Sequence, residues 1–380
     1  MEQHKVGLVA TSRKENEHRL PIHPLHLHRI PTELRAQLCL ETGYGEAFGF
    51  TDEQLEPQVA GMLPRAELIS SCEVVVLPKP TAAEVAELPD GAVLWGWPHC
   101  VQDPVITQLA IDKKLTLIAF EAMNYWHRDG SFNLHVLHKN NELAGYASVL
   151  HAMSLVGATG DYGRRRTAAV IGFGATARGA VTALTALGIG QVDVLTQRGR
   201  TAVASPIHSA NIRQFDPGED GLGGMVETER DTEPLPSFLA ERDIIVNCVL
   251  QDPNSPMTFM DAQDLATLRP GTLIVDVSCD LGMGFSWARP TSFEDPMFEV
   301  GDHVRYYGVD HSPSYLWDSA TWEVSEALLP YLGTVLGGPA AWEADETIRR
   351  AIEIRDGKII NPSILAFQSR AAEYPHRVTT

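Results

Sequence analysis

The sequence of 380 residues has few of the features that mark disulfide-rich, secreted or membrane-spanning proteins. Its cysteines are odd in number and no Cys-x-x-Cys pair occurs, which argues against a disulfide framework or a cysteine-rich zinc site. No apolar run approaches the ~18 residues that a membrane-spanning helix needs. No signal-peptide segment precedes the first strand-like run. We therefore expect a cytoplasmic protein with reduced thiols and no membrane partner.

An excess of basic charge is also missing. The chain carries 30 Lys and Arg against 49 Asp and Glu, a formal net charge of −19, and no basic stripe interrupts this balance. A nucleic-acid partner is therefore not expected. A small anionic substrate is compatible with the charge, because it needs only a few local cations. The hydrophobic content of 44% and charged content of 21% are those of an ordinary globular chain.

Several catalytic motifs are absent. There is no Gly-x-Ser-x-Gly nucleophile elbow. No Walker lysine follows the glycine-rich loop described below, so nucleotide hydrolysis is unsupported. Four histidines cluster at His18, His23, His26 and His28, but nearby prolines interrupt any helix, and the last three do not share one helical face. We predict no metal site there.

Short apolar runs alternate with helix-like stretches along the chain, which is typical of an α/β fold with largely parallel sheets. In the first part, strands are expected at Val6–Ala10, Val74–Leu77, Ala92–Trp95 and Leu115–Phe120, and a helix at Pro31–Leu40. After a helix at Asn141–Val156, a second series of strands is expected at Ala168–Ile171, Val192–Thr196, Ile244–Cys248 and Leu273–Val277. The segment Gly199–Glu229 is interpreted as connecting and surface structure.

The C-terminal helical patterns, Ser319–Tyr331 and Glu343–Ile352, suggest that the end of the chain packs back on the first domain. We therefore predict two Rossmann-like domains with parallel sheets and an interdomain cleft. Residues 1–140 plus 320–380 would form a discontinuous substrate and catalytic domain. Residues 141–319 would form an inserted dinucleotide-binding domain.

The strongest local motif is a buried strand that runs into Gly172-Phe173-Gly174-Ala175-Thr176-Ala177 and then a helix. In such a Gly-x-Gly-x-x-Ala turn, Gly172 permits the tight bend and Gly174 lets the backbone approach a pyrophosphate at the helix N-terminus. We assign Gly172, Gly174, Ala175 and Thr176 to a dinucleotide cofactor. The alternative is a purely structural glycine turn.

The next strand ends without the acidic residue that usually holds the ribose hydroxyls of NAD. Thr196, Arg198 and Arg200 occupy that neighbourhood instead. A guanidinium pairs with a 2′-phosphate, whereas a carboxylate would repel it. The sequence therefore predicts NADP(H) in preference to NAD(H), unless the two arginines are only solvated loop charges.

Three side chains in the first domain follow strand-like runs. They are Arg19, Lys79 and His99. Ligands bind beyond the carboxyl ends of parallel strands, so these groups could together clamp a carboxylate and move a proton. Taken singly, each is more readily explained as a surface charge or a loop histidine.

At these residues the chain resembles the alanine dehydrogenase and saccharopine dehydrogenase superfamily over nearly its whole length. Arg19, Lys79-Pro80 and His99 look like the substrate-carboxylate arginine, cleft lysine and active-site histidine of that family. The segments with Gly96-Trp97-Pro98-His99 and Lys139–Ala147 are most similar to N5-(carboxyethyl)ornithine synthases, which are similar in using NADPH. The segments that contain Asp276, Ser278 and Asp310 resemble saccharopine dehydrogenase segments near the nicotinamide, which implies cofactor contacts for these three residues.

The resemblance implies an NADPH-dependent opine-type dehydrogenase that joins an amino acid amine to a 2-oxo acid such as pyruvate through an imine. His99 is then the first choice of proton donor and Lys79 the second. Arg19 would hold a carboxylate. Glu121 would hold the ammonium of the amino acid, or is merely an exposed carboxylate at a strand end.

Three alternatives stay open. One is a saccharopine dehydrogenase-like enzyme, another an alanine dehydrogenase-like enzyme, and the third a non-catalytic NADPH-binding sensor with the same fold. His23 stands where the relatives usually carry threonine or a small apolar residue, so the amine donor is open. The sequence is compatible with a homo-oligomer but does not indicate one.

Overall fold

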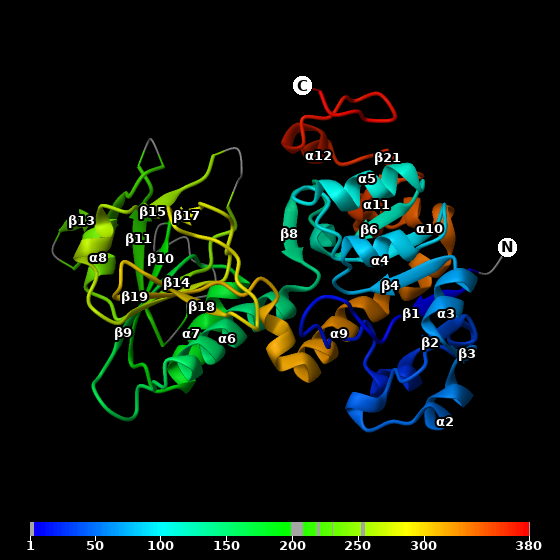
Figure 1. The fold of residues 1–380 in the computed structure, drawn as a ribbon, viewed down its shortest axis with the longest axis horizontal. Coiled ribbons are helices and arrows are strands. Elements are labelled where there is room, and N and C mark those ends of the chain that lie inside the picture. The colour runs from blue at the N-terminus through cyan, green and yellow to red at the C-terminus, as the bar shows by residue number, and fades with distance from the viewer. Residues whose placement is uncertain are drawn as a thin grey trace. The chain divides into compact units, whose positions relative to one another are not determined.

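The computed structural model describes residues 4–198, 207, 209–218, 221–229, 231–251 and 255–379. The chain divides into two compact units, one formed by Met1–His138 with Trp317–Thr380 and the other by Lys139–Leu316. Each unit contains a sheet and covering helices (Figure 1). All five cysteines are free thiols. Within the described residues, no helix is long and apolar enough to cross a membrane.

The first unit contains an eight-stranded sheet in the order β21-β20-β6-β5-β4-β1-β2-β3. Its six central and outer strands from β6 to β3 run parallel, whereas β20 pairs antiparallel with β6. The strands are β1 (Val6–Leu8), β2 (Leu38–Glu41), β3 (Gly61–Leu63), β4 (Val74–Leu77), β5 (Val93–Gly96), β6 (Thr116–Ala119), β20 (Ile352–Arg355) and β21 (Lys358–Ile359). A separate hairpin consists of β7 (Asn124–Trp126) and β8 (Phe132–His135).

Helices cover this sheet on both faces. They are α1 (Thr32–Arg35), α2 (Asp52–Leu55), α3 (Arg65–Ser71), α4 (Ala82–Glu87), α5 (Pro104–Asp112), α9 (Trp317–Leu336), α10 (Gly338–Ala344), α11 (Glu346–Ala351) and α12 (Pro362–Phe367). Helix α9 places Val324, Leu328 and Val335 in the same apolar core as Leu8 and Trp95. Their spacings of four and seven residues, about one and two helical turns, put these side chains on one face. The C-terminal part of the chain therefore completes the core of the first unit.

The second unit contains a nine-stranded sheet in the order β13-β12-β11-β10-β9-β14-β16-β19-β18. These strands are β9 (Thr167–Ile171), β10 (Gln191–Thr196), β11 (Asn211–Asp216), β12 (Met225–Glu227), β13 (Thr232–Pro234), β14 (Ile244–Asn247), β16 (Thr272–Asp276), β18 (Met297–Val300) and β19 (Val304–Tyr307). The small pair β15 (Thr258–Met260) and β17 (Gly284–Phe285) lies apart from the nine-stranded sheet. The helices are α6 (His138–Leu155), α7 (Ala175–Ala186) and α8 (Leu235–Ala240).

In both units the chain starts in the middle of the sheet, adds strands to one side and then continues on the other. The parallel order is β3-β2-β1-β4-β5-β6 in the first unit and β11-β10-β9-β14-β16-β19 in the second. This is the strand order of a Rossmann fold, in which ligands bind where the direction reverses. The predicted α/β class with two Rossmann-like domains is confirmed.

Helices α6 and α7 pack at unusually short range. A Cβ atom on Gly179 would lie 1.7 Å from the carbonyl oxygen of Glu142, and one on Gly145 would lie 1.9 Å from that of Thr176. Because no side chain fits at either position, the two glycines allow the backbones to touch. This contact fixes the helix that begins at the glycine-rich turn.

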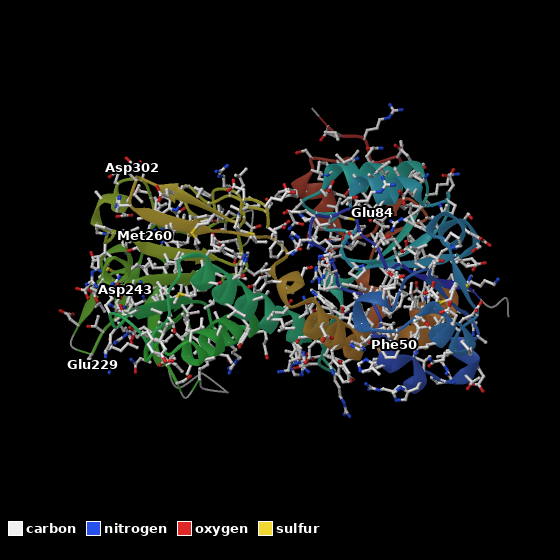
Figure 2. All side chains as sticks on the ribbon, turned by 60° about the horizontal axis from the view of Figure 1, so that its bottom comes forward. Phe50, Glu84, Glu229, Asp243, Met260 and Asp302 are labelled. Atoms are coloured by element: carbon white, nitrogen blue, oxygen red, sulfur yellow. The ribbon has the colours of Figure 1, made fainter. Side chains whose placement is uncertain are left out.

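Buried polar contacts also fix the start of β9. Asp243, labelled in Figure 2, is almost fully buried just before β14. It accepts hydrogen bonds from the Arg164 guanidinium at 2.6 Å and from the backbone N–H of Thr167 at 2.9 Å. The ion pair ties the arginine-rich segment before β9 to the neighbouring strand.

Two sequence predictions for local structure are wrong. The helix expected over Pro31–Leu40 ends at Arg35, because Leu38–Leu40 form a fully buried strand. The segment Gly199–Glu229 is not only connecting structure, since its described part supplies β11 and β12 to the second sheet.

Candidate active site

Four neighbouring strands of the first unit end beside the predicted catalytic residues. Glu121, His99 and Lys79 follow β6, β5 and β4, and Arg19 lies on the segment that follows β1. Because these strands are parallel neighbours, their carboxyl ends share one edge of the sheet. The segments after β1 and β4 flank the point where the strand order reverses, which is the ligand-binding position in this topology.

Lys79, His99 and Glu121 form a row of titratable groups. Lys79 Nζ lies 3.3 Å from His99 Nε2, and His99 Nδ1 lies 3.8 Å from Glu121 Oε1. The first distance fits an ammonium donating to a neutral imidazole, which then carries its proton on Nδ1. The His99 side chain is 40% exposed, so the imidazole is accessible at the end of the sheet. Such a row can receive a proton at one end and release it at the other.

The backbone of His99 is held in an uncommon conformation. Its φ angle is +48°, in the left-handed region that costs a non-glycine residue free energy. The N–H of His99 donates to Glu121 Oε1 at 2.7 Å, and its carbonyl accepts from the N–H of Asp103 at 2.9 Å. These contacts compensate for the strain and direct the imidazole toward Lys79.

Arg19 lies in a different environment from the one expected for a substrate-binding arginine. It is only 6% exposed, and its Nε donates to Glu17 Oε1 at 2.8 Å. Its guanidinium also lies 4.9 Å from the ring centroid of Trp97, two residues before His99. Glu17 therefore already balances the charge of Arg19. The role of Arg19 in binding a substrate carboxylate remains a prediction.

The sequence analysis did not single out a second carboxyl group, which lies on the strand that pairs with β6. Glu353, on β20, is 4% exposed. Burial raises the pKa of Glu121 and of Glu353, and the proximity of Glu353 raises the pKa of Glu121 further. No local motif marks Glu353, because it reaches this place only through the pairing of β20 with β6.

The predicted dinucleotide turn in the second unit has the backbone that a phosphate cradle needs. Gly172 has a φ of +114°, and a Cβ atom there would lie 3.0 Å from the carbonyl oxygen of Cys248. Gly174 is the N-cap of α7, and a Cβ there would meet nothing within 4 Å. The N-terminus of this 12-residue helix, with Ala175 and Thr176 in its first turn, therefore faces open space. The residues fit a bound pyrophosphate.

The residues predicted to recognise the ribose follow the neighbouring strand, β10. Thr196 is buried, and its hydroxyl oxygen accepts the backbone N–H of Arg198 at 3.1 Å. Arg198 is exposed, so its guanidinium is accessible to a 2′-phosphate. Arg200 lies outside the described residues. The absence of a carboxylate at the end of β10 and the position of Arg198 are both compatible with the predicted NADP(H) preference.

The three residues assigned near the nicotinamide differ in accessibility. Asp276 is fully buried, and it accepts hydrogen bonds from Asn247, from the Tyr306 hydroxyl and from the backbone N–H of Cys279. Burial raises the pKa of Asp276 to about 6. Both of its oxygens accept hydrogen bonds inside the protein, which favours a structural role. The cofactor contact of Asp276 remains a prediction.

Ser278 and Asp310 lie in the loops after β16 and β19. The Ser278 hydroxyl donates to the Val249 carbonyl at 2.6 Å, and Asp310 Oδ1 lies 2.6 Å from His311 Nδ1. Both loops stand at the edge of the sheet where Gly172 begins its turn, because β9, β14, β16 and β19 are parallel. Their cofactor contacts remain predictions.

The histidine cluster near the N-terminus contributes to packing. His23 and His26 are buried, and His26 lies edge-on to Trp322 with ring centroids 4.1 Å apart. Burial lowers the pKa of His26 to about 4, so the ring is neutral at physiological pH. In the part of the chain that the structure describes, no group of three or more His, Cys, Asp or Glu side chains is arranged to hold a metal ion.

Comparisons with known proteins match both parts of the chain. The family model described as "Alanine dehydrogenase/PNT, N-terminal domain" matches residues 8–144, and "Alanine dehydrogenase/PNT, C-terminal domain" matches residues 144–362. An alanine dehydrogenase of Mycobacterium tuberculosis is 24% identical over 372 residues, which cover 95% of each chain. An N(5)-(carboxyethyl)ornithine synthase of Clostridium botulinum is 24% identical over 326 residues, which cover 82% of this chain and 89% of the relative.

The solved structures support the same fold. An L-alanine dehydrogenase matches with a TM-score of 0.74 and 22% sequence identity, covering 96% of this chain and 98% of its own. The family models, which together match residues 8–362, confirm at the level of the family the resemblance inferred from the sequence.

Proposed function

The chain belongs to the alanine dehydrogenase/PNT family, and from this premise we propose that it is an NADPH-dependent oxidoreductase acting on CH–NH groups. More specifically, it joins the amine of an ornithine- or lysine-like amino acid to a 2-oxo acid such as pyruvate, in the manner of an opine dehydrogenase. The observation that carries the proposal is the row Lys79–His99–Glu121 at the carboxyl edge of the first sheet. A binding protein has no need of a proton-transfer row.

The proposed chemistry has two stages. The amine adds to the carbonyl carbon of the 2-oxo acid, and the resulting carbinolamine loses water to give an imine. The imine then gains a hydride at carbon and a proton at nitrogen to become a secondary amine. When bound, the nicotinamide cofactor supplies that hydride.

The residues of the first unit would serve the first stage. The imidazole of His99 gives a proton to the departing hydroxyl group, so that water leaves. Before the transfer, the Lys79 ammonium, 3.3 Å from Nε2, places a positive charge near the 2-oxo acid carboxylate. It donates a proton to Nε2 as the imidazole gives up the proton on Nδ1. Arg19, while paired with Glu17, is proposed to bind a carboxylate of the substrate. Glu121 is proposed to bind the ammonium of the incoming amino acid.

The residues of the second unit would hold the cofactor. Gly172, Gly174, Ala175 and Thr176 would surround the pyrophosphate at the start of α7. Thr196 and Arg198 would recognise the ribose phosphate. Residues 1–140 with 320–380 would thus form the substrate domain, and residues 141–319 the dinucleotide domain.

The cofactor preference is tested by Arg198→Asp. A carboxylate at this exposed position repels a 2′-phosphate and can accept hydrogen bonds from ribose hydroxyls. We expect the ratio of kcat/KM for NADPH over that for NADH to fall by about 100-fold, since a charge-assisted pair is replaced by repulsion. Arg165→Asp, which also removes an exposed arginine of this unit but precedes β9, at the opposite end of that strand from the glycine turn, serves as the matched control. An unchanged preference in Arg198→Asp would contradict the assignment.

The reaction itself is tested by the loss of NADPH absorbance. Pyruvate and 2-oxoglutarate are each combined with ammonia, ornithine, lysine and a wider set of amino acids, with NADH in parallel. Oxidation that requires both a 2-oxo acid and an amino acid supports the proposal. Oxidation with ammonia would instead favour an alanine dehydrogenase-like reaction, and lysine with 2-oxoglutarate a saccharopine dehydrogenase-like one. NADPH binding without any oxidation would favour a sensor.

A further inference from the structure

A small cavity of about 150 Å³ lies at the amino ends of three parallel strands in the second unit. Ile244 begins β14, and Leu273 and Arg305 are the second residues of β16 and β19. The three residues are register partners across the sheet, so their side chains lie on the same face. The turn at Gly172 follows the carboxyl end of β9, which runs parallel to β14. The cavity and the glycine turn therefore lie at opposite edges of this sheet.

The lining of the cavity combines an apolar surface with a group of arginines. The apolar side chains are those of Met153, Val156, Ile244 and Leu273, and the cationic ones are those of Arg164, Arg166 and Arg305. Among the described residues that line the cavity, none is acidic. The result is a local excess of positive charge in a chain whose formal net charge is −19.

Asp243, labelled in Figure 2, compensates one of the three charges from outside the lining. Its Oδ1 accepts a hydrogen bond from Arg164 Nη1 at 2.6 Å, and its Oδ2 accepts the backbone N–H of Thr167 at 2.9 Å. Both oxygens of this buried carboxylate are thus engaged. The ion pair holds the Arg164 side chain at the cavity and leaves further N–H groups of the guanidinium, since arginine has five.

Arg166 and Arg305 carry the two remaining charges. In the described part of the chain, the only ion pair formed by an arginine of this cavity is that of Arg164 with Asp243. Glu299 of β18 stands opposite Arg305 in the strand register, but the two side chains do not form an ion pair. The carboxyl end of α6 contributes a partial negative charge of about half an elementary charge. An anion between the guanidinium groups would therefore remove an uncompensated repulsion.

The size and the charge of the cavity indicate the class of anion. Its volume is well below the roughly 300–1,000 Å³ of pockets that hold drug-sized ligands, so it fits a compact group. Two uncompensated positive charges match a phosphate group, which carries about −1.5 to −2 at neutral pH. Guanidinium groups also suit phosphate in shape, because they donate paired N–H bonds to its oxygens.

We propose that this cavity binds a phosphate group, either as free phosphate or as the terminal phosphoryl group of a small metabolite. The bound group would accept hydrogen bonds from Arg166, from Arg305 and from the remaining N–H groups of Arg164. It would thereby connect the segment before β9, the end of α6 and the start of β19, and so stabilise the second unit. The site does not depend on the proposed reaction.

The experiment is isothermal titration calorimetry of the full chain with inorganic phosphate, with and without saturating NADPH. Phosphate that binds at the glycine turn competes with NADPH, whereas phosphate in this cavity does not. We expect Kd to rise about tenfold in Arg166→Gln and in Arg305→Gln, because each loses a charge-assisted hydrogen bond. Arg165→Gln removes an adjacent exposed arginine that does not line the cavity, and should leave Kd unchanged.

Thermal unfolding provides a second readout. Phosphate should raise the melting temperature of the wild type and of Arg165→Gln more than that of the double variant Arg166→Gln with Arg305→Gln, because a ligand stabilises the folded state that binds it. The melting temperatures without phosphate show that each variant is folded. Either single variant is sufficient for the comparison of Kd.

Titrations with glycerol phosphate and malonate identify the ligand. Equal binding of glycerol phosphate and phosphate would support a phosphoryl group carried by a metabolite, and binding of phosphate alone would support the free ion. Malonate that binds as tightly as phosphate would overturn the assignment to phosphate. The absence of saturable binding at millimolar phosphate, binding abolished by NADPH, or an equal loss in Arg165→Gln and Arg305→Gln would overturn the site itself.

Discussion

Replacing His99 by asparagine is expected to lower kcat by about 10²- to 10⁴-fold, the usual contribution of a positioned general acid or base. The imidazole is the central member of the row, 3.3 Å from Lys79 Nζ and 3.8 Å from Glu121 Oε1, so no neighbour can take its place without moving. The measurement is the steady-state rate with the substrate pair that supports NADPH oxidation.

Asparagine is chosen because of the backbone. His99 has a φ of +48°, and asparagine tolerates this left-handed region better than alanine, which would add strain to the loss of the imidazole. The variant should therefore keep the wild-type melting temperature and its affinity for NADPH. His127→Asn, at an exposed histidine of the same unit, controls for the change of residue type. Turnover that survives in His99→Asn would remove His99 from the mechanism and move the proton-donor role to Lys79.

The sequence indicated the fold through its strongest hydrophobic patterns. Continuous apolar runs such as Val74–Leu77 and Ile244–Asn247 are buried parallel strands, because both faces of such a strand are covered. The glycine turn at Gly172 was recognisable because its positive φ and close backbone contact require glycine.

The two wrong predictions of local structure concern segments whose sequence pattern favours one structure and whose tertiary contacts favour another. Leu38–Leu40 continue an apparently helical pattern, but β1 offers them a parallel partner, and burial on both faces favours the strand. The strand β11 carries few apolar residues, so its pairing with β10 left little signal in the sequence.

The grouping of the candidate residues was predictable only at strand ends. Lys79, His99 and Glu121 were expected to lie together because each stands just after an apolar run, and parallel strands end at the same edge. The position of Glu353 could not be predicted, because an antiparallel strand from the far end of the chain brings it there. The sequence also could not reveal that the guanidinium of Arg19 is paired with Glu17, since short separation along a loop does not determine side-chain contact.

Replacing Arg19 by alanine is expected to destabilise the first unit as well as impair any carboxylate binding. The side chains of Arg19 and Glu17 are 3% and 1% exposed, so the variant would remove the Arg19 guanidinium from a buried carboxylate. Breaking a buried pair from one side costs about 3–5 kcal/mol in the free energy of unfolding. The loss of the guanidinium above Trp97 removes packing as well. Chemical denaturation of the apoprotein measures the effect without reference to substrate.

The double variant Arg19→Met with Glu17→Gln separates the structural task of Arg19 from its proposed task in binding. An apolar chain of similar length beside a neutral amide leaves no buried charge, so most of the lost stability should return. If Arg19 also holds a substrate carboxylate, the KM for one acid substrate stays raised in this stable protein. Recovery of both stability and KM would mean that Arg19 pairs with Glu17 but binds no substrate carboxylate. The cation that binds the substrate carboxylate would then have to be Lys79. Because the two quantities are measured on the same folded variant, the ion pair and the binding role cannot be mistaken for one another.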